Sequence, residues 1–353
     1  MQRAADDRAG TERARKHVRP LRWLPLTVLS LGLLAAVVLA AGVGSVAISP
    51  GQVVRAIEHG LAGRLAGPLD TIVWQLRLPR VLLSALVGGA LALAGVAYQG
   101  VFRNPLADPY LLGVASGAGF GASLVLVFGA ALPVLVRLGL PLVAFAFALG
   151  AVALVMLLAQ QGGRLPIISL ILAGVVVGSS LSAATSFVLL LAREQAAGVL
   201  AWLLGSFAFA SWERVLAVLL FMLPATLVML ASARALDLLQ LGEESAMHLG
   251  LPSGAFKLGL VTVATLVTAA AVAVSGIIGF VGLIMPHAAR LAFGPGHRRL
   301  IPLSVLLGAL FLVLADLVAR TLIAPGELPI GVVTALVGGP FFLWLLRRGR
   351  PGS

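Results

Sequence analysis

Asp316 and Arg320 are the residues whose spacing most directly suggests chemistry inside an apolar segment. They lie four positions apart, which puts both side chains on one face of a helix. An acid at membrane depth can relay protons in an ion-coupled carrier, or it can belong to a structural ion pair. The arginine favours the ion pair, because a neighbouring positive charge keeps the carboxylate ionised. We therefore interpret the two residues as a salt bridge near the outer membrane face, with a proton relay as the alternative.

A second group of polar side chains gives another apolar segment a weakly polar face. The group consists of Ser179, Ser180, Ser182 and Thr185. Small residues of this kind allow helices to pack closely within a membrane. The same hydroxyl groups could instead line a translocation path, and the sequence favours neither interpretation over the other.

Other kinds of reactive site are not indicated. The chain has no cysteine, so disulfides, thiolate metal sites and cysteine nucleophiles are excluded. The five histidines are not spaced as metal pairs, and no phosphate-binding loop of the Walker type occurs. No cluster of polar groups suggests an integral-membrane enzyme. We expect no catalytic residue, metal site or bound cofactor on this chain, and any ATP hydrolysis must occur on another one.

The composition indicates that lipid is the main solvent of this chain. Of its 353 residues, 60% are hydrophobic and only 11% are charged, whereas roughly a quarter of a soluble domain is charged. Lipid offers no partner to unpaired backbone groups and no apolar run alternates like a strand, so we predict an all-α integral membrane protein. A span needs about 20 apolar residues. Ten transmembrane helices are predicted near 24–47, 81–101, 111–136, 138–159, 167–192, 215–231, 258–274, 277–292, 301–323 and 328–346.

The basic residues flank these runs and form no separate domain, which argues against nucleic-acid binding despite a net charge of +12. With ten spans both termini lie on one side, and seventeen of the 25 Lys and Arg residues fall there. The positive-inside rule places that side in the cytoplasm. We predict a cytoplasmic tail at 1–22, a transmembrane domain at 23–347 and a second cytoplasmic tail at 348–353.

Two extramembrane segments are longer than a turn. Segment 49–79 faces outward and includes a candidate amphipathic helix at 53–65. Segment 232–256 faces the cytoplasm and contains a short helical stretch at 241–250. That stretch could dock a soluble partner, or it could simply cover the end of the bundle. The residues alone leave both interpretations open.

Several motifs of this sequence, in this order, resemble the permeases of binding-protein-dependent ABC importers for vitamin B12, ferric siderophores and haem. They extend from about residue 70 to the C-terminus. The matching stretches are Arg77–Arg80, Gly88–Ala92, Arg103–Pro109, Leu241–Leu251, Gly276–His287 with Arg290, Ala315–Asp316 with Arg320, and Glu327–Gly331 running into Thr334.

The resemblance implies a type II importer permease fold of about ten helices, as in the vitamin B12 importer, in a bacterial inner membrane. It implies a homodimer with the substrate path along its two-fold axis. Two ATPase subunits, which carry ATP and Mg, would dock from the cytoplasm, and one substrate-binding protein from outside.

The resemblance also assigns residues to these two docking surfaces. The coupling element that receives the ATPase matches Leu241, Gly242, Glu243, Ala246, Leu249 and Gly250. The arginines that receive carboxylates of the binding protein match Arg77, Arg80 and Arg320. Three arginines at an outer rim would form a fixed cationic surface, although they could instead anchor the protein to lipid headgroups.

The cargo is the least defined part of the prediction. A large metal chelate needs few specific contacts in the permease, because the binding protein selects it. We rank a ferric chelate (siderophore or haem) first and cobalamin close behind. The turn at 162–169 has fewer hydroxyl residues than some relatives carry there, so no gate residues are assigned. The alternative function is an ion-coupled secondary carrier that works without an ATPase.

Overall fold

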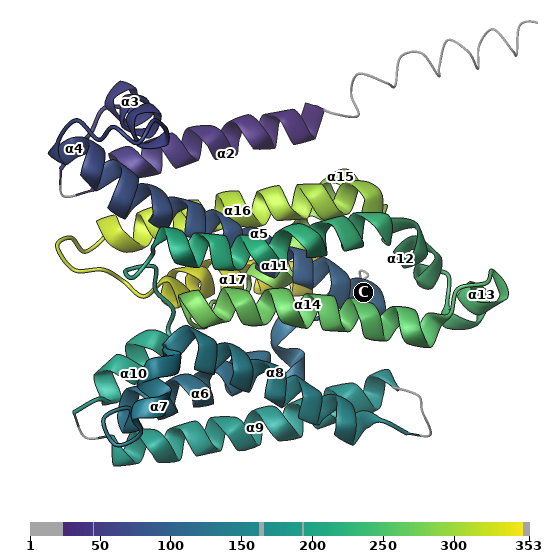
Figure 1. Ribbon diagram of the computed structural model, residues 1–353. Helices are drawn as coiled ribbons and strands as arrows, with labels where there is room; N and C mark the ends of the chain where they lie inside the picture. The colour runs from purple at the N-terminus through teal and green to yellow at the C-terminus, as the bar shows by residue number, and fades with distance from the viewer. Residues whose placement is uncertain (1–23, 45, 162–165, 193, 349–353) are drawn as a thin grey trace, which may run out of the picture.

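The fold is a bundle of helices that run roughly parallel to one another (Figure 1). This computed structural model describes residues 24–44, 46–161, 166–192 and 194–348. The predicted tails, at 1–22 and from 349 onward, lie outside the described residues, as does the 162–165 part of the hydroxyl-poor turn. Every element in the described ranges is a helix.

Ten of the described helices are apolar enough to belong to a membrane domain, which confirms the predicted number. Seven of them are long enough to cross a bilayer: α2 (Leu24–Gly42), the continuous run of α4 (Pro68–Thr71), η2 (Ile72–Arg77) and α5 (Leu78–Phe102), α8 (Leu140–Ala159), α9 (Ile167–Leu191), α11 (Trp212–Ala231), α14 (Ser253–Ser275) and α16 (His297–Thr321). Three are shorter: α6 (Val114–Phe128), α15 (Val281–Phe293) and α17 (Ile330–Arg348).

Some boundaries differ from the prediction. The run expected as one helix at 111–136 is divided into η3 (Pro109–Leu112), α6 and α7 (Pro133–Leu138). Pro133 explains the second division, because a proline disfavours the helical conformation of the residue before it. The second span begins at Pro68 rather than near residue 81. The short outer helix is present as α3 (Pro50–Leu61), while α10 (Ala196–Leu203) was not predicted.

Helix α5 lies at the centre of the bundle and touches its neighbours through glycines. Gly88 on α5 crosses Gly308 on α16 so closely that a Cβ on Gly88 would lie 2.2 Å from the Gly308 carbonyl oxygen. A Cβ on Gly95 would lie 1.8 Å from the carbonyl oxygen of Gly282 on α15. Small residues let backbones approach in lipid, where packing supplies much of the association energy. These crossings fix the position of α5 against α15 and α16.

The chain leaves the helical conformation between α14 and α15, where Gly276 and Phe280 both have a φ of 71°. Protein groups satisfy the exposed backbone there. Tyr110 Oη donates to the Ile278 carbonyl at 2.9 Å and accepts from the Ile278 amide at 3.2 Å, while the Ser206 amide donates to the Ser275 carbonyl at 2.8 Å. Irregular backbone within a membrane domain is tolerated under such conditions. Tyr110, which directly follows the Arg103–Pro109 motif, therefore contacts the Gly276–His287 motif at Ile278.

The two ends of the bundle carry different small elements (Figure 1). At one end lie α3 and α4. At the other end, α12 (Ala233–Gln240) and α13 (Glu243–His248) extend beyond the long helices. Helix α5 connects the two ends, because Arg80 stands near its start and the Gly100 carbonyl near its finish accepts a 3.0 Å hydrogen bond from Gln240 Nε2 on α12.

Candidate functional site

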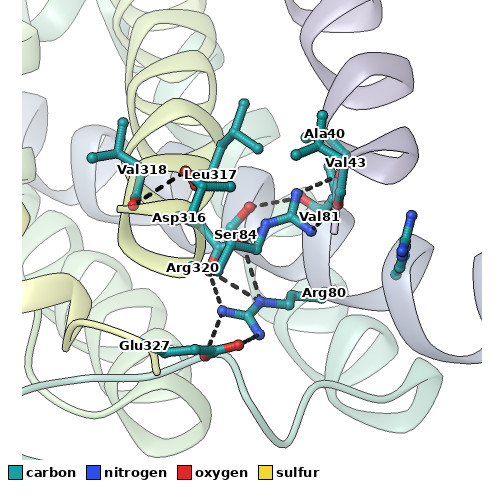
Figure 2. A network of polar contacts seen from close by, with 12 residues as sticks. Ala40, Val43, Arg80, Val81, Ser84, Asp316, Leu317, Val318, Arg320 and Glu327 are labelled. Carbon is teal, nitrogen blue, oxygen red and sulfur yellow. Dashed lines mark hydrogen bonds and ion pairs between the residues drawn. The ribbon is translucent and has the colours of Figure 1, made fainter. Parts of the chain in front are cut away.

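The predicted docking arginines gather near the start of α5, where Arg80 is the centre of an ion-pair network (Figure 2). Its Nη2 donates to Asp316 Oδ1 on α16 at 2.9 Å, and its Nε lies 3.1 Å from the same oxygen. Its Nη1 and Nη2 donate to Glu327 Oε1 and Oε2 at 2.8 Å and 3.0 Å. One guanidinium group thus joins α5, α16 and the loop between α16 and α17.

Arg320 confirms the predicted i,i+4 ion pair, because its Nε lies 3.6 Å from Asp316 Oδ2. Its remaining donors bind the end of α2, with Nη1 2.9 Å from the Val43 carbonyl oxygen and Nη2 bonded to the Ala40 carbonyl. The last carbonyls of a helix have no partner within the helix, and a nearby cation also interacts favourably with the helix dipole. Arg320 therefore holds α2 against α16.

Arg77 caps the same end of α2. Its Nη1 donates to the carbonyls of Ala41 and Gly42 at 3.1 Å and 2.9 Å, and its Nη2 donates to the Val46 carbonyl at 2.6 Å. The residue is only 8% exposed. Together Arg77 and Arg320 supply the C-terminal carbonyls of α2 with donors that the sequence of α2 itself lacks.

The structure brings Arg77, Arg80 and Arg320 together, but it also shows how each is already engaged. The exposed fraction of the side chain is 14% for Arg80 and 7% for Arg320. The most accessible member of the network is Glu327, at 41%. Sequence reasoning recognised Glu327 only as part of a motif and missed its pairing with Arg80. The only indication of this pair in the sequence is a single acid, Glu327, in the loop that follows Arg320.

The opposite end carries the predicted coupling residues on α13 and its flanks. Gly242 begins this helix with a φ of 114°, and Gly250 follows it with a φ of 86°, so each bounding position adopts a backbone that favours glycine. Glu243 accepts from Ser253 Oγ at 3.2 Å and pairs with Lys257 Nζ at 2.5 Å. The Lys257 ammonium, through this hydrogen bond, holds the pKa of Glu243 below its ordinary value. Glu243 thus fastens α13 to the start of α14.

The outer surface of this segment includes three large apolar side chains. Ala246 is fully buried, whereas Leu241 is 67% exposed, Met247 is 53% exposed and Leu249 is 62% exposed. We call Leu241, Met247 and Leu249 the apolar tip. Such a group on a protruding element indicates an interaction surface.

Helix α12 connects this segment to the bundle. Besides the bond between Gln240 and Gly100, Asp237 accepts from the amide of His297 at 3.0 Å and contacts its Nδ1 at 2.6 Å. These contacts tie α12 to α5 and to the start of α16.

The predicted hydroxyl face lies on α9, a helix at the edge of the bundle that packs against α6 and α8. Ser179, Ser180 and Ser182 are exposed, whereas Thr185 is buried. Ser182 Oγ donates to Ser116 Oγ on α6 at 3.2 Å, and Thr185 Oγ1 donates to the Leu181 carbonyl at 2.8 Å. Ser179, Ser180 and Ser182 are therefore accessible at the surface of this chain, although Ser182 also contacts α6.

No group of three or more His, Asp and Glu side chains that could hold a metal ion occurs among the residues the structure describes. Arg80, Asp316 and Glu327 form ion pairs at one end and Glu243 forms one at the other, while Arg77 and Arg320 cap a helix. An apolar bundle with seven described helices long enough to cross a bilayer has the organisation of an integral membrane protein.

Comparisons with known proteins define the class more closely. The chain is 42% identical to the cobalamin import system permease of Halobacterium salinarum, over 92% of this chain and 89% of that protein. It is 41% identical to the hemin transport system permease of Yersinia pestis, over 79% of this chain and 84% of that protein. A solved structure described as an inward-facing ABC transporter of the metal-chelate type superposes with a TM-score of 0.80 at 34% identity, covering 92% of this chain and 98% of that one.

The family model of the FecCD transport family matches residues 32–348. The chain belongs to the FecCD transport family and is the permease subunit of an ABC importer, whose ATPase activity resides in a separate subunit.

Proposed function

We propose that this permease carries a large metal chelate, either a ferric siderophore, haem or cobalamin, into the cytoplasm. The similarity to a cobalamin permease and to a hemin permease is nearly equal, so it supports this class of cargo and no single member of it. The hydrophobic composition of the helices fits a path that makes few specific contacts.

The observation that carries the proposal is that the two candidate docking surfaces lie at opposite ends of one central helix. Arg80 and Gly100 are separated on α5 by twenty residues, which corresponds to about 30 Å of helix, the thickness of the hydrocarbon core. A partner at the arginines and a partner at α12 and α13 would therefore sit on opposite faces of the membrane. A shift of α5 together with α15 and α16, against which its glycines are closely packed, would couple them.

The apolar tip supports docking of an ATPase at α13. A surface helix that merely covered the bundle would turn its leucines inward, whereas Leu241 and Leu249 are exposed. The ion pair of Glu243 with Lys257 would keep α13, and with it the apolar tip, fixed to α14 when the ATPase moves. Burial of such side chains in a groove is a common way of docking a short helix.

The arginine network supports docking of a binding protein at the other end. Arg77 and Arg320 build the surface, because they fix the end of α2. Arg80 is held in place by Asp316, and its second carboxylate partner is the exposed Glu327. A carboxylate of the binding protein would meet a preorganised arginine there.

The chain is proposed to act as a homodimer, with two ATPase subunits and one binding protein, in a bacterial inner membrane. The hydroxyl face of α9 would line the path between the two copies through the exposed Ser179, Ser180 and Ser182, whereas Thr185 is buried within the chain and would not reach it. The distribution of Lys and Arg supports cytoplasmic termini, which puts α13 on the ATPase side.

Reconstitution with the partner ATPase in liposomes tests this function. Binding protein loaded with a ferric siderophore, haem or cobalamin is added separately, and ATP hydrolysis and uptake are measured. We expect stimulation and ATP-dependent uptake with one of the three. Uptake that follows a proton gradient and needs no ATPase would contradict the proposal and favour a secondary carrier.

A further inference from the structure

A cavity of about 1260 Å³ opens between α2, α11, α12 and the turn from α15 into α16. It exceeds the volume of roughly 300–1,000 Å³ that is usual for small-molecule sites. Its lining is formed by Leu26, Leu230, Ala231, Asp237, Phe293, Gly294, Pro295, Gly296, Arg298, Arg299 and Pro302.

One part of the wall is apolar and continuous with the lipid-facing surface. Leu230 and Phe293 line the cavity, and the neighbouring Leu227 and Leu291, on the same helices, are each 61% exposed. Helices α11 and α15 belong to the membrane domain, so the exposed side chains of Leu227 and Leu291 would lie against lipid acyl chains. The cavity therefore offers an apolar molecule a way in from the bilayer.

The other part of the wall is basic. Arg298 and Arg299 are exposed in the first turn of α16, and neither guanidinium has a hydrogen-bond or ion-pair partner within the described ranges. The single acid of the lining, Asp237, is engaged by both the amide and the ring of His297. Asp237 also caps the start of α16, so any attraction of an anion here comes from the two arginines and not from the helix terminus.

We propose that this cavity binds an anionic phospholipid. The phosphate would lie between Arg298 and Arg299, and an acyl chain would follow Leu230 and Phe293 towards the bilayer. Basic pockets between transmembrane helices at a membrane surface suit such headgroups, and a guanidinium group binds phosphate through two parallel hydrogen bonds. The lipid would fill the space between α2 and the rest of the bundle at this end. The inference rests on the membrane fold and not on the identity of the cargo.

Lipid retention in detergent tests the proposal. The full chain is purified from membranes containing phosphatidylglycerol and phosphatidylcholine, and bound lipid is measured by native mass spectrometry. We expect preferential retention of phosphatidylglycerol. The double variant R298Q/R299Q should lose about tenfold or more in affinity for it, because hydrogen bonds between charged partners are among the strongest in proteins. The matched control, R55Q/R137Q, removes two exposed arginines elsewhere and should retain the lipid.

A second variant separates the cavity from simple surface charge. Ala231→Trp keeps both arginines but fills the apolar part, so it should also release phosphatidylglycerol. Equal retention of the two lipids, retention by Ala231→Trp, or equal loss in both double variants would overturn the proposal. Displacement of the lipid by millimolar inorganic phosphate would identify a site for soluble anions and would also overturn it. None of these readouts depends on transport.

Discussion

Arg80 and Asp316 are 236 positions apart in the chain, yet Nη2 of the arginine lies 2.9 Å from Oδ1 of the aspartate. Arg320, one turn from Asp316, is farther away at 3.6 Å, and it directs its other nitrogens to α2. The buried carboxylate thus receives its main partner from α5 and a second from its own helix (Figure 2). Asp316 therefore connects α5 to α16 at this end of the bundle.

Asp316→Asn should destabilise the fold by roughly 3 kcal/mol, because it removes the charge that balances two poorly hydrated arginines. Denaturant unfolding in mild detergent measures the loss. Glu327→Gln is the control, since it removes the exposed partner of the same arginine and should cost less than about 1 kcal/mol. Equal losses in the two variants would show that burial does not govern this network.

The stability supplied by Glu327 should depend on pH. Hydrogen bonding to Arg80 holds the pKa of Glu327 below its ordinary value. The folded state therefore binds this proton less readily than the unfolded state. The stabilisation from Glu327 is complete above the ordinary pKa of a glutamate, about 4.3. It is lost as the pH falls through the lowered pKa of the folded state. Melting temperatures of the wild-type chain and of Glu327→Gln should converge between about pH 5 and pH 3. A constant difference over this range would contradict the assignment.

The glycine crossing between α5 and α16 predicts a steric effect. A Cβ on Gly308 would lie 2.4 Å from the Gly88 carbonyl oxygen, so Gly308→Ala must push the two helices apart. Overpacking of this kind costs about 1–3 kcal/mol. Gly150→Ala, in α8, is the matched control, because a Cβ there meets nothing within 4 Å. Unfolding measurements should show a loss for the first variant and no loss for the second.

The apolar tip should govern the affinity for the ATPase under the proposed function. Leu249→Asp places a charge on a side chain that is 62% exposed, so the fold should tolerate it. A charge buried without a partner in an apolar interface costs more than about 2 kcal/mol, so the affinity should fall more than tenfold. Leu61→Asp, an exposed leucine of α3, is the control. Pull-down of the ATPase in detergent distinguishes them, and equal binding by both variants would rule out the tip as the docking surface.

The sequence predicts the parts of this structure that depend on local rules. Apolar runs of sufficient length identify the membrane helices, and the four-residue spacing identifies the pair of Asp316 with Arg320. The contacts of Arg80 with Glu327, and of Arg77 with the end of α2, depend on how helices cross. Those crossings are fixed by close packing at residues such as Gly88. The periodic pattern of a helix does not encode which other helix packs against it. For this reason the pairing of Arg320 with Asp316 could be predicted, while the partners of Arg77 and the pairing of Arg80 with Glu327 could not.

If a binding protein docks at Arg80, substitutions of Glu327 and of Arg80 should change its affinity in opposite directions. Glu327 occupies both terminal nitrogens of Arg80, so a carboxylate from the partner must compete with it. Glu327→Gln should therefore raise the affinity for the binding protein, by about threefold to tenfold, because a neutral amide competes less strongly for a guanidinium group. Arg80→Gln should lower the affinity instead. Surface plasmon resonance on the permease in nanodiscs measures both, and a melting curve for each variant shows whether the bundle is intact. A loss of affinity in both folded variants would mean that Glu327 itself contacts the partner, and unchanged affinity in both would place the docking surface away from Arg80.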